Sequence, residues 1–305
     1  MSNYFDNKEL FLQPKTNQYG SHMIMSNVMK ESKIKYINFD TRFRDEYNYN
    51  AVSNYNITLP QRLNEVHNIS ITNVEIPNTF FNISGNLGNN SFKITSGATV
   101  KIITVPDGNY DKTTTTLKTA INNALVAATF PASGPGSLAF DISGNYASFT
   151  PNGSFTINFD VDPSGNFNKY NFKSRLGWLL GFRNQSYTFS SKITSECFVD
   201  LTGSRYLYLV VDEFSAGNQS SFVSPLPTSL INKNILGRIS LDPQSYPYLS
   251  VIPANCGNGL LLSDTRSYSG KVNLQKINVQ LINEYGIVMN LNGADFSFCL
   301  RVEHE

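Results

Sequence analysis

The sequence predicts a mainly β protein, an antiparallel β-sandwich that carries a smaller inserted α+β region and an extended N-terminal arm. Short stretches rich in Val, Ile, Thr and aromatic residues recur along the chain, and such residues favour strands. Turn-forming pairs such as Asn258-Gly259, which tolerate positive φ, separate these stretches. A helical period is convincing in one segment alone, so the helices are few.

The composition is that of a folded protein with a neutral surface. The chain has 305 residues, of which 40% are hydrophobic and 15% charged, with a net charge of +1. This length allows one large β domain or two smaller ones. The high share of hydrophobic residues and the low net charge argue against disorder, which needs the opposite composition. This composition also argues against a nucleic-acid partner, because neutralising phosphates needs clustered Lys and Arg.

Cysteine usage and apolar runs indicate assembly in a reducing cytosol. Cys197, Cys256 and Cys299 lie far apart without a zinc-type spacing, so we expect no metal site and no disulfide framework from them. The first residues lack the pattern of a signal peptide. No apolar run approaches the roughly 18 residues of a membrane span. We therefore expect no membrane span.

The first strands follow residue 33. Residues 34–39 read as a strand, and a second strand with alternating apolar residues runs from Asn54 to Leu59, where Pro60 is expected to stop it. A third strand spans residues 66–76, with a break in phase after Ile71. Each of these strands has one face on a core.

The middle of the chain predicts the inserted region. Residues 92–105 form a hairpin that turns at Ser96-Gly97. A helix near 114–128 follows, capped by Asp111 or by one of the threonines at 113–116. Short strands come next, and residues 176–182 form an apolar plug. The apolar stripe of the helix consists of Leu117, Ala120, Ile121, Ala124, Leu125 and Ala128.

Strands return in the last third, which suggests a division into domains. We expect the sandwich in residues 34–84 plus 196–305 and the inserted α+β unit in residues 85–195. Two sandwiches in tandem are the alternative. The late strands are expected at 197–201, 206–214, 235–241, 272–282 and 296–302.

Residues 1–33 form the arm, in which small apolar clusters alternate with polar residues without a sustained period. One interpretation is a flexible terminus. The other is an arm that orders by placing its apolar clusters in pockets of a neighbouring subunit. The candidate contact residues are Phe5, Leu10, Phe11, Leu12, Met23, Ile24 and Met25.

The best metal candidate is the segment that begins at Asp160. The oxygens of Asp160, Asp162 and Ser164 fall at the spacing of the first half of a calcium loop. However, Pro163 lies inside the segment, and Asn171 stands where a bidentate Glu is needed. The flanks also read as strands, so a plain β-turn is the favoured interpretation.

The sequence offers no constellation for catalysis, and we expect that the chain is not an enzyme. His22, His67 and His304 are scattered, and no Gly-x-Ser-x-Gly or P-loop pattern occurs. Asp212 and Glu213 are adjacent in a strand, so their side chains point to opposite faces and cannot act on one substrate. We assign this pair to a solvated strand end.

A charged cluster follows the first strand and is the most interesting polar feature. Asp40, Arg42, Arg44 and Asp45 alternate in sign. Arginine at a strand end makes bidentate pairs with carboxylates of its own fold or of a neighbour. A structural or interface salt bridge is therefore favoured over catalysis.

Seven segments carry a resemblance to a known family: residues 37–45, 55–60, 71–83, 105–110, 176–182, 234–239 and 291–298. Together they resemble minor capsid and penton-type proteins of nucleocytoplasmic large DNA viruses. The resemblance extends from residue 34 to the C-terminus and does not include the arm. It implies a jelly-roll-like sandwich, no cofactor and a place in an icosahedral shell, at a five-fold vertex or beneath or between the major capsomers.

The resemblance implies the major capsid protein and other capsid subunits as partners, with a pentamer if the role is penton-like. Arm exchange and sandwich edges are ways to lock such subunits together. Two rivals come from other classes. A carbohydrate- or receptor-binding module would use the same sandwich with exposed aromatic residues, and a hydrolase would need an acid or nucleophile site assembled only by the fold.

Overall fold

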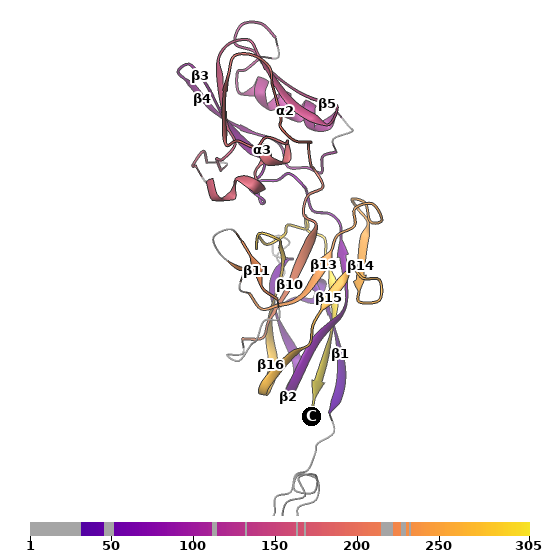
Figure 1. The fold of residues 1–305 in the computed structure, drawn as a ribbon. Helices are drawn as coiled ribbons and strands as arrows, with labels where there is room; N and C mark the ends of the chain where they lie inside the picture. Colours follow the sequence, from indigo (N-terminus) through magenta and orange to yellow (C-terminus); the bar gives the residue numbers. More distant parts are fainter. Residues whose placement is uncertain are drawn as a thin grey trace, which may run out of the picture.

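The computed structural model describes residues 32–45, 52–111, 115–131, 133–162, 164–167, 169–214, 222–226, 230–231 and 233–305. Figure 1 shows two bodies, one above the other, joined by a narrow waist. The fold is mainly β, with curled antiparallel sheets and few helices, and it agrees with a jelly-roll-like arrangement. The fold class that the strand pattern and the resemblance predict is thereby confirmed.

The lower body contains the largest sheet, in which eight strands pair antiparallel. Their order is β1-β17-β2-β16-β10-β13-β15, and β14 pairs with the far end of β2. The strands are β1 (Lys33–Asp40), β2 (Asn54–Pro77), β10 (Tyr206–Asp212), β13 (Ile235–Ser240), β14 (Val251–Asn255), β15 (Leu261–Ser263), β16 (Arg266–Asn283) and β17 (Ser297–His304). A short pair, β11 (Ser224–Pro225) and β12 (Leu230–Ile231), and a turn of 3-10 helix, η1 (Thr41–Phe43), complete this body.

Strand β2 runs unbroken for 24 residues, so the expected stop at Pro60 is wrong. The register between β2 and β16 shifts between the pairs Thr58–Lys276 and Leu63–Leu274, which places Pro60 in an irregular stretch of the ladder. The pairing with β17 begins only at Val66. A proline is tolerated there because its missing N–H removes no ladder hydrogen bond.

The phase break in the second half of β2 has a structural cause. Ile71 pairs with Leu300 and Asn73 pairs with Cys299, so Thr72 is an extra residue on β2. Such a bulge turns the following side chains to the other face and keeps the apolar residues on the core.

The large sheet curls over one core until the strand at one end, β15, reaches β2. Strand β16 pairs with β2 along most of its length and with β10 at its end, so it carries the sheet around the bend. On the far side, the backbone N–H of Ile71 donates to the Ser263 hydroxyl of β15 at 3.0 Å. Burying each large apolar side chain in this core contributes about 1.5–3 kcal/mol.

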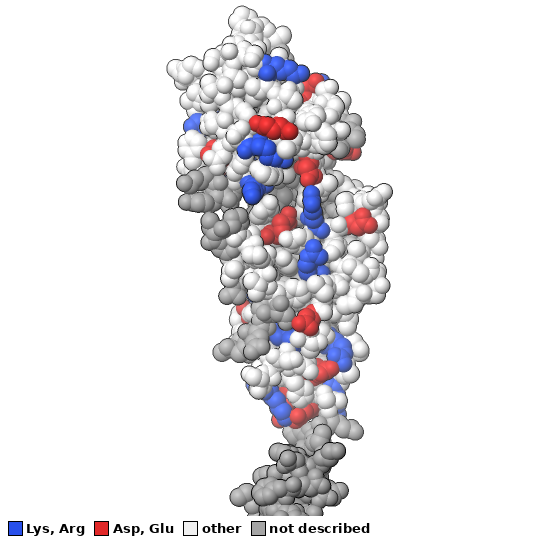
Figure 2. Space-filling view, in the orientation of Figure 1, with Lys and Arg blue, Asp and Glu red and all other residues white. Residues whose placement is uncertain are grey.

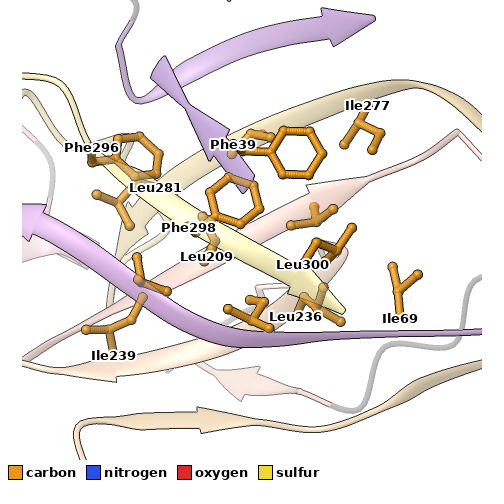
Figure 3. Packing of buried hydrophobic residues seen from close by; sticks show 14 of the residues in the cluster. Phe39, Ile69, Leu209, Leu236, Ile239, Ile277, Leu281, Phe296, Phe298 and Leu300 are labelled. Carbon is orange, nitrogen blue, oxygen red and sulfur yellow. The ribbon is translucent and has the colours of Figure 1, made fainter. Parts of the chain in front are cut away.

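Figure 3 shows the centre of this core, where aromatic rings from β1 and β17 stack. Phe39 and Phe298 lie opposite each other in the ladder, with ring centroids 4.8 Å apart, and Phe296 stacks on Phe298. These contacts fasten β1 to the sheet from its core face.

The upper body, called the inserted body below because its elements lie between β2 and β10 in the chain, holds a second set of elements. The predicted hairpin is confirmed, with its turn at Gly97 in the left-handed region. The predicted helix is α2 (Thr116–Ala127), which buries Leu117, Ile121 and Leu125; Thr115 is its N-cap, without a side-chain cap hydrogen bond. The other elements are β3 (Ser91–Ser96), β4 (Thr99–Thr104), β5 (Leu138–Ser143), β6 (Tyr146–Pro151), β7 (Phe155–Asn158), η3 (Lys169–Ser174), α3 (Leu176–Leu179), β8 (Ser186–Phe189) and β9 (Ile193–Thr194).

Residues 197–201 are not a strand, contrary to the expectation. The backbone N–H groups of Cys197 and Asp200 donate to the carbonyls of Gly181 and Leu179 at the end of α3, and that of Val199 donates to the Asn145 carbonyl in a turn. An apolar run that is satisfied in this irregular way forms no ladder.

The two main clusters of buried residues have no residue in common. One takes its members from residues 39–76 and 207–302, and the other from residues 83–201. Two connecting segments, near residues 78–82 and 201–205, run between the bodies (Figure 1). Each cluster therefore has its own set of strands.

Candidate functional site

The charged cluster after β1 lies at the end of the strand, where it caps η1. The Asp40 carboxylate accepts hydrogen bonds from the backbone N–H of Arg42 at 2.9 Å and from its Nε at 3.0 Å. The hydrogen bond from the Arg42 side chain holds the pKa of Asp40 below its ordinary value, although burial opposes the shift. The Arg42 guanidinium remains exposed and also lies over the ring of Phe43.

Arg44 and Asp45 are engaged inside the chain. The Arg44 side chain is 1% exposed and donates to Asp295 Oδ1 at 3.1 Å and to the Thr41 carbonyl. Asp45 accepts from the backbone N–H of Thr58 at 3.0 Å and from its hydroxyl at 2.7 Å. These bonds fix the segment after β1 to β2 and to the start of β17.

The open edge of β1 is the exposed apolar feature that the sequence did not single out. Strand β1 ends the sheet order and pairs with β17 on one side only among the described residues. Its outward side chains Ile34 and Tyr36 are 51% and 64% exposed, and Phe43 follows at its end. We call Ile34, Tyr36, Arg42 and Phe43, with the β1 backbone groups that pair with no other described strand, the β1 edge. Such an edge is a ready template for pairing with another chain.

The arm clusters lie outside the described residues. Phe5, Leu10, Phe11, Leu12 and the Met23–Met25 group therefore remain predicted contact residues. The chain reaches the described structure directly before β1, so the arm joins the sandwich at the β1 edge.

The calcium candidate forms a turn. The backbone N–H of Asn166 donates to the Asp162 carboxylate at 2.9 Å, and the Gly165 N–H donates to the Asp162 carbonyl at 2.8 Å. Asp160, two residues after the end of β7, is buried, and Ser164 is exposed. Within the part of the chain that the structure describes, no three His, Cys, Asp or Glu residues gather as a metal site would need.

The assignment of Glu213 to a solvated strand end is wrong. Its carboxylate lies inside the sandwich, where it accepts from Arg266 at 2.7 Å and from the Tyr268 hydroxyl at 2.7 Å. Arg266 also donates to the Val211 carbonyl at 2.8 Å. A long-range partner such as Arg266, 53 residues away, leaves no local signal in the sequence.

Charges of both signs are intermixed on the face shown in Figure 2. None of the helices described is both long and apolar enough to cross a membrane. The three cysteines are free thiols.

Comparisons with known proteins give similarity in part of the sequence and in the fold. A family of unknown function (DUF5901) matches residues 22–144. No curated protein matches the chain. The structure of the mavirus penton protein is 11% identical, with a TM-score of 0.44, over 90% of this chain and 100% of that one. A chain of the Sputnik virophage is 12% identical, with a TM-score of 0.39, over 88% of this chain and 98% of that one.

Proposed function

We propose that the chain is a structural subunit of an icosahedral virus capsid, a minor capsid or penton-type protein that holds the shell together through protein–protein contacts. The observation that carries this proposal is the β1 edge. A subunit that must join neighbours needs exposed apolar side chains beside backbone groups that can accept another strand. Ile34 and Tyr36 supply the first, and β1 supplies the second.

The arrangement of the two ends of the molecule supports the proposal. The start of β1 and the C-terminus lie together at one pole, since Lys33 pairs with His304, and the inserted body lies at the other pole (Figure 1). We propose residues 34–84 plus 196–305 as the shell-forming sandwich and residues 85–195 as a unit that projects from it. The arm, residues 1–33, would then leave the sandwich at the pole that meets neighbouring subunits.

The proposed partners are the major capsid protein and further copies of this chain, five of them if the role is penton-type. The proposed location is the virion. No catalytic role, cofactor or nucleic-acid partner belongs to the proposal.

The test is the oligomeric state in solution. Light scattering would compare the full chain with a chain lacking residues 1–33, each with and without the major capsid protein. We expect a pentamer, or binding to the capsid protein that requires the arm. A full chain that stays monomeric and ignores the capsid protein would contradict the proposal.

A matched pair of substitutions tests the β1 edge itself. Ile34→Glu places a charge on the exposed edge, whereas Val100→Glu places one on β4 of the inserted body, where the side chain is similarly exposed, at 53%. We expect Ile34→Glu to abolish the assembly and Val100→Glu to leave it intact. Equal effects of the two changes would exclude the β1 edge as the contact.

A further inference from the structure

A pocket of about 370 Å³ lies at the waist between the two bodies. The connecting segments form one wall, and the loop after β13 forms the other. We call it the junction pocket and define it by Phe81, Tyr110, Asp200, Asp242, Tyr246 and Tyr248. Its size and its position between two bodies are those of small-molecule sites.

Aromatic rings supply the apolar part of the lining. Phe81 and Tyr248 come from opposite walls, with ring centroids 6.4 Å apart. The Tyr110 hydroxyl donates to the Pro106 carbonyl at 2.7 Å, which fixes its ring, and burial raises the pKa of this phenol. Rings held in this way offer flat faces to the C–H side of a ligand.

Three carboxylates line the pocket, Asp111, Asp200 and Asp242, and the last two are fixed hydrogen-bond acceptors. Asp200 accepts from the Thr202 hydroxyl at 2.6 Å and from Arg205 at 3.2 Å. Asp242 accepts from the backbone N–H groups of Gln244 and Ser245. Burial opposes the shift at Asp200, but the bonds from Thr202 lower its pKa, and the bonds from Ser245 lower that of Asp242. Both groups therefore remain acceptors at neutral pH.

The backbone around the pocket is held in place before any ligand arrives. The Asn78 side chain donates to the Tyr246 carbonyl at 2.9 Å, and its backbone N–H donates to the Ser250 carbonyl at 2.8 Å. Asn82 donates to the Leu201 carbonyl at 2.7 Å and so ties the two connecting segments together. A wall fixed in this way lowers the entropic cost of binding.

The charge of the lining selects the class of ligand. No Lys or Arg is among the described residues that line the pocket, so phosphates and acidic sugars would meet carboxylates and no cationic lining residue. The charge of Asp200 is already offset by Arg205, which weakens the attraction for a cation. Fixed acceptors beside aromatic faces suit a neutral molecule that is rich in hydroxyl donors.

We propose that the junction pocket binds a neutral saccharide unit. This binding site is additional to the structural role proposed above and does not depend on it. Its lining includes no residue of the β1 edge.

The test is nuclear magnetic resonance titration of the full chain with a panel of neutral mono- and disaccharides built from glucose, galactose, mannose, rhamnose and N-acetylglucosamine. N-acetylneuraminic acid and putrescine serve as anionic and cationic comparisons. The variants are Tyr248→Ala and Asp242→Asn; the second keeps an oxygen for the turn that Asp242 caps. Tyr285→Ala is the control, because this exposed tyrosine lines a neighbouring cleft and not the junction pocket.

We expect saturable binding of at least one neutral saccharide, with a dissociation constant of about 1 mM, as befits so few atoms. Affinity should fall about tenfold or more in Tyr248→Ala and in Asp242→Asn, a loss of about 1.4 kcal/mol or more, and stay unchanged in Tyr285→Ala. The proposal is overturned if no neutral saccharide binds, if only the acidic sugar or putrescine binds, or if both pocket variants bind as the unaltered chain does.

Discussion

Arg266 and Glu213 form an ion pair in the interior of the sandwich, in which each side chain is 1% exposed. Arg266 begins β16, and Glu213 directly follows β10, so the pair joins two strands across the core. Tyr268 donates to the same carboxylate. Burial raises the pKa of this phenol, and the contact with Glu213 raises it further. Charges this deep are tolerated because nearly every polar atom has a partner.

Removing one member of this pair should be costly. Glu213→Leu leaves the guanidinium of Arg266 buried without its counter-charge, and we expect a loss of about 3–5 kcal/mol in the free energy of unfolding. The double change Arg266→Met with Glu213→Leu should cost clearly less than the sum of the single changes. Urea unfolding followed by circular dichroism measures these free energies of unfolding. Fluorescence would not, since the single tryptophan, Trp178, lies in the inserted body.

The control for this measurement is an exposed ion pair. Lys118 and Asp141 lie 2.7 Å apart with both side chains about half exposed. Lys118→Ala should therefore change the free energy of unfolding by less than about 1 kcal/mol. Equal losses at both sites would show that the buried pair has no special role.

Gly177 should tolerate no side chain. A Cβ at this position would overlap the ring of Phe159, which stacks on Phe182 in the core of the inserted body. We expect Gly177→Ala to cost about 1–3 kcal/mol and to lower the midpoint of the Trp178 fluorescence transition. Gly97→Ala, at a hairpin turn with open space around it, should cost only the strain of its positive φ, about 1 kcal/mol.

Asn82 should control the rigidity of the waist. Its amide donates to the carbonyls of Tyr110 and Leu201, and its oxygen accepts from the Tyr110 N–H. Asn82→Ala leaves these two carbonyls and the Tyr110 N–H without their hydrogen-bond partner. We expect a loss of about 2–3 kcal/mol in the free energy of unfolding, together with faster hydrogen exchange at the Tyr110 amide. Asn86→Ala removes one exposed bond to Val288 and should leave that exchange rate unchanged.

The partly buried carboxyl of Glu284 should make the stability of the protein depend on pH. Burial raises the pKa of its carboxyl above the ordinary value. The folded protein then binds this proton more tightly than the unfolded chain does, so the contribution is most favourable below the unfolded pKa and declines as pH rises through the folded pKa. Glu284→Gln should therefore stabilise the protein at about pH 7 and not at about pH 4. An equal effect of the substitution at both values would refute this assignment.

The sequence predicted elements whose cause is local and missed those whose cause is distant. The stripe of Leu117, Ile121 and Leu125 specifies α2 within twelve residues, and its face is buried as expected. Strand β14 was missed because Pro253 lies within it. This proline pairs opposite Glu75 of β2, and no local pattern reveals that partner.

The candidate site shows the same division. The bond between Arg42 and Asp40 spans two residues, and the alternation of charges predicted a salt bridge in this cluster without naming the partners. The partner of Arg44 is Asp295, 251 residues away, and only the curled sheet brings the two together. The junction pocket likewise needs both connecting segments and the loop after β13, so no single stretch of sequence contains it.

The second half of β2 gives the molecule a mechanical axis. Its residues 66–77 span about 40 Å when extended, and Pro77 precedes a segment that enters the inserted body. A pull on that body along this half loads the hydrogen bonds to β17 in shear, so many must break together. Force should therefore unfold the inserted body before the sandwich. The contacts of the sandwich with its neighbours would then persist while the inserted body extends.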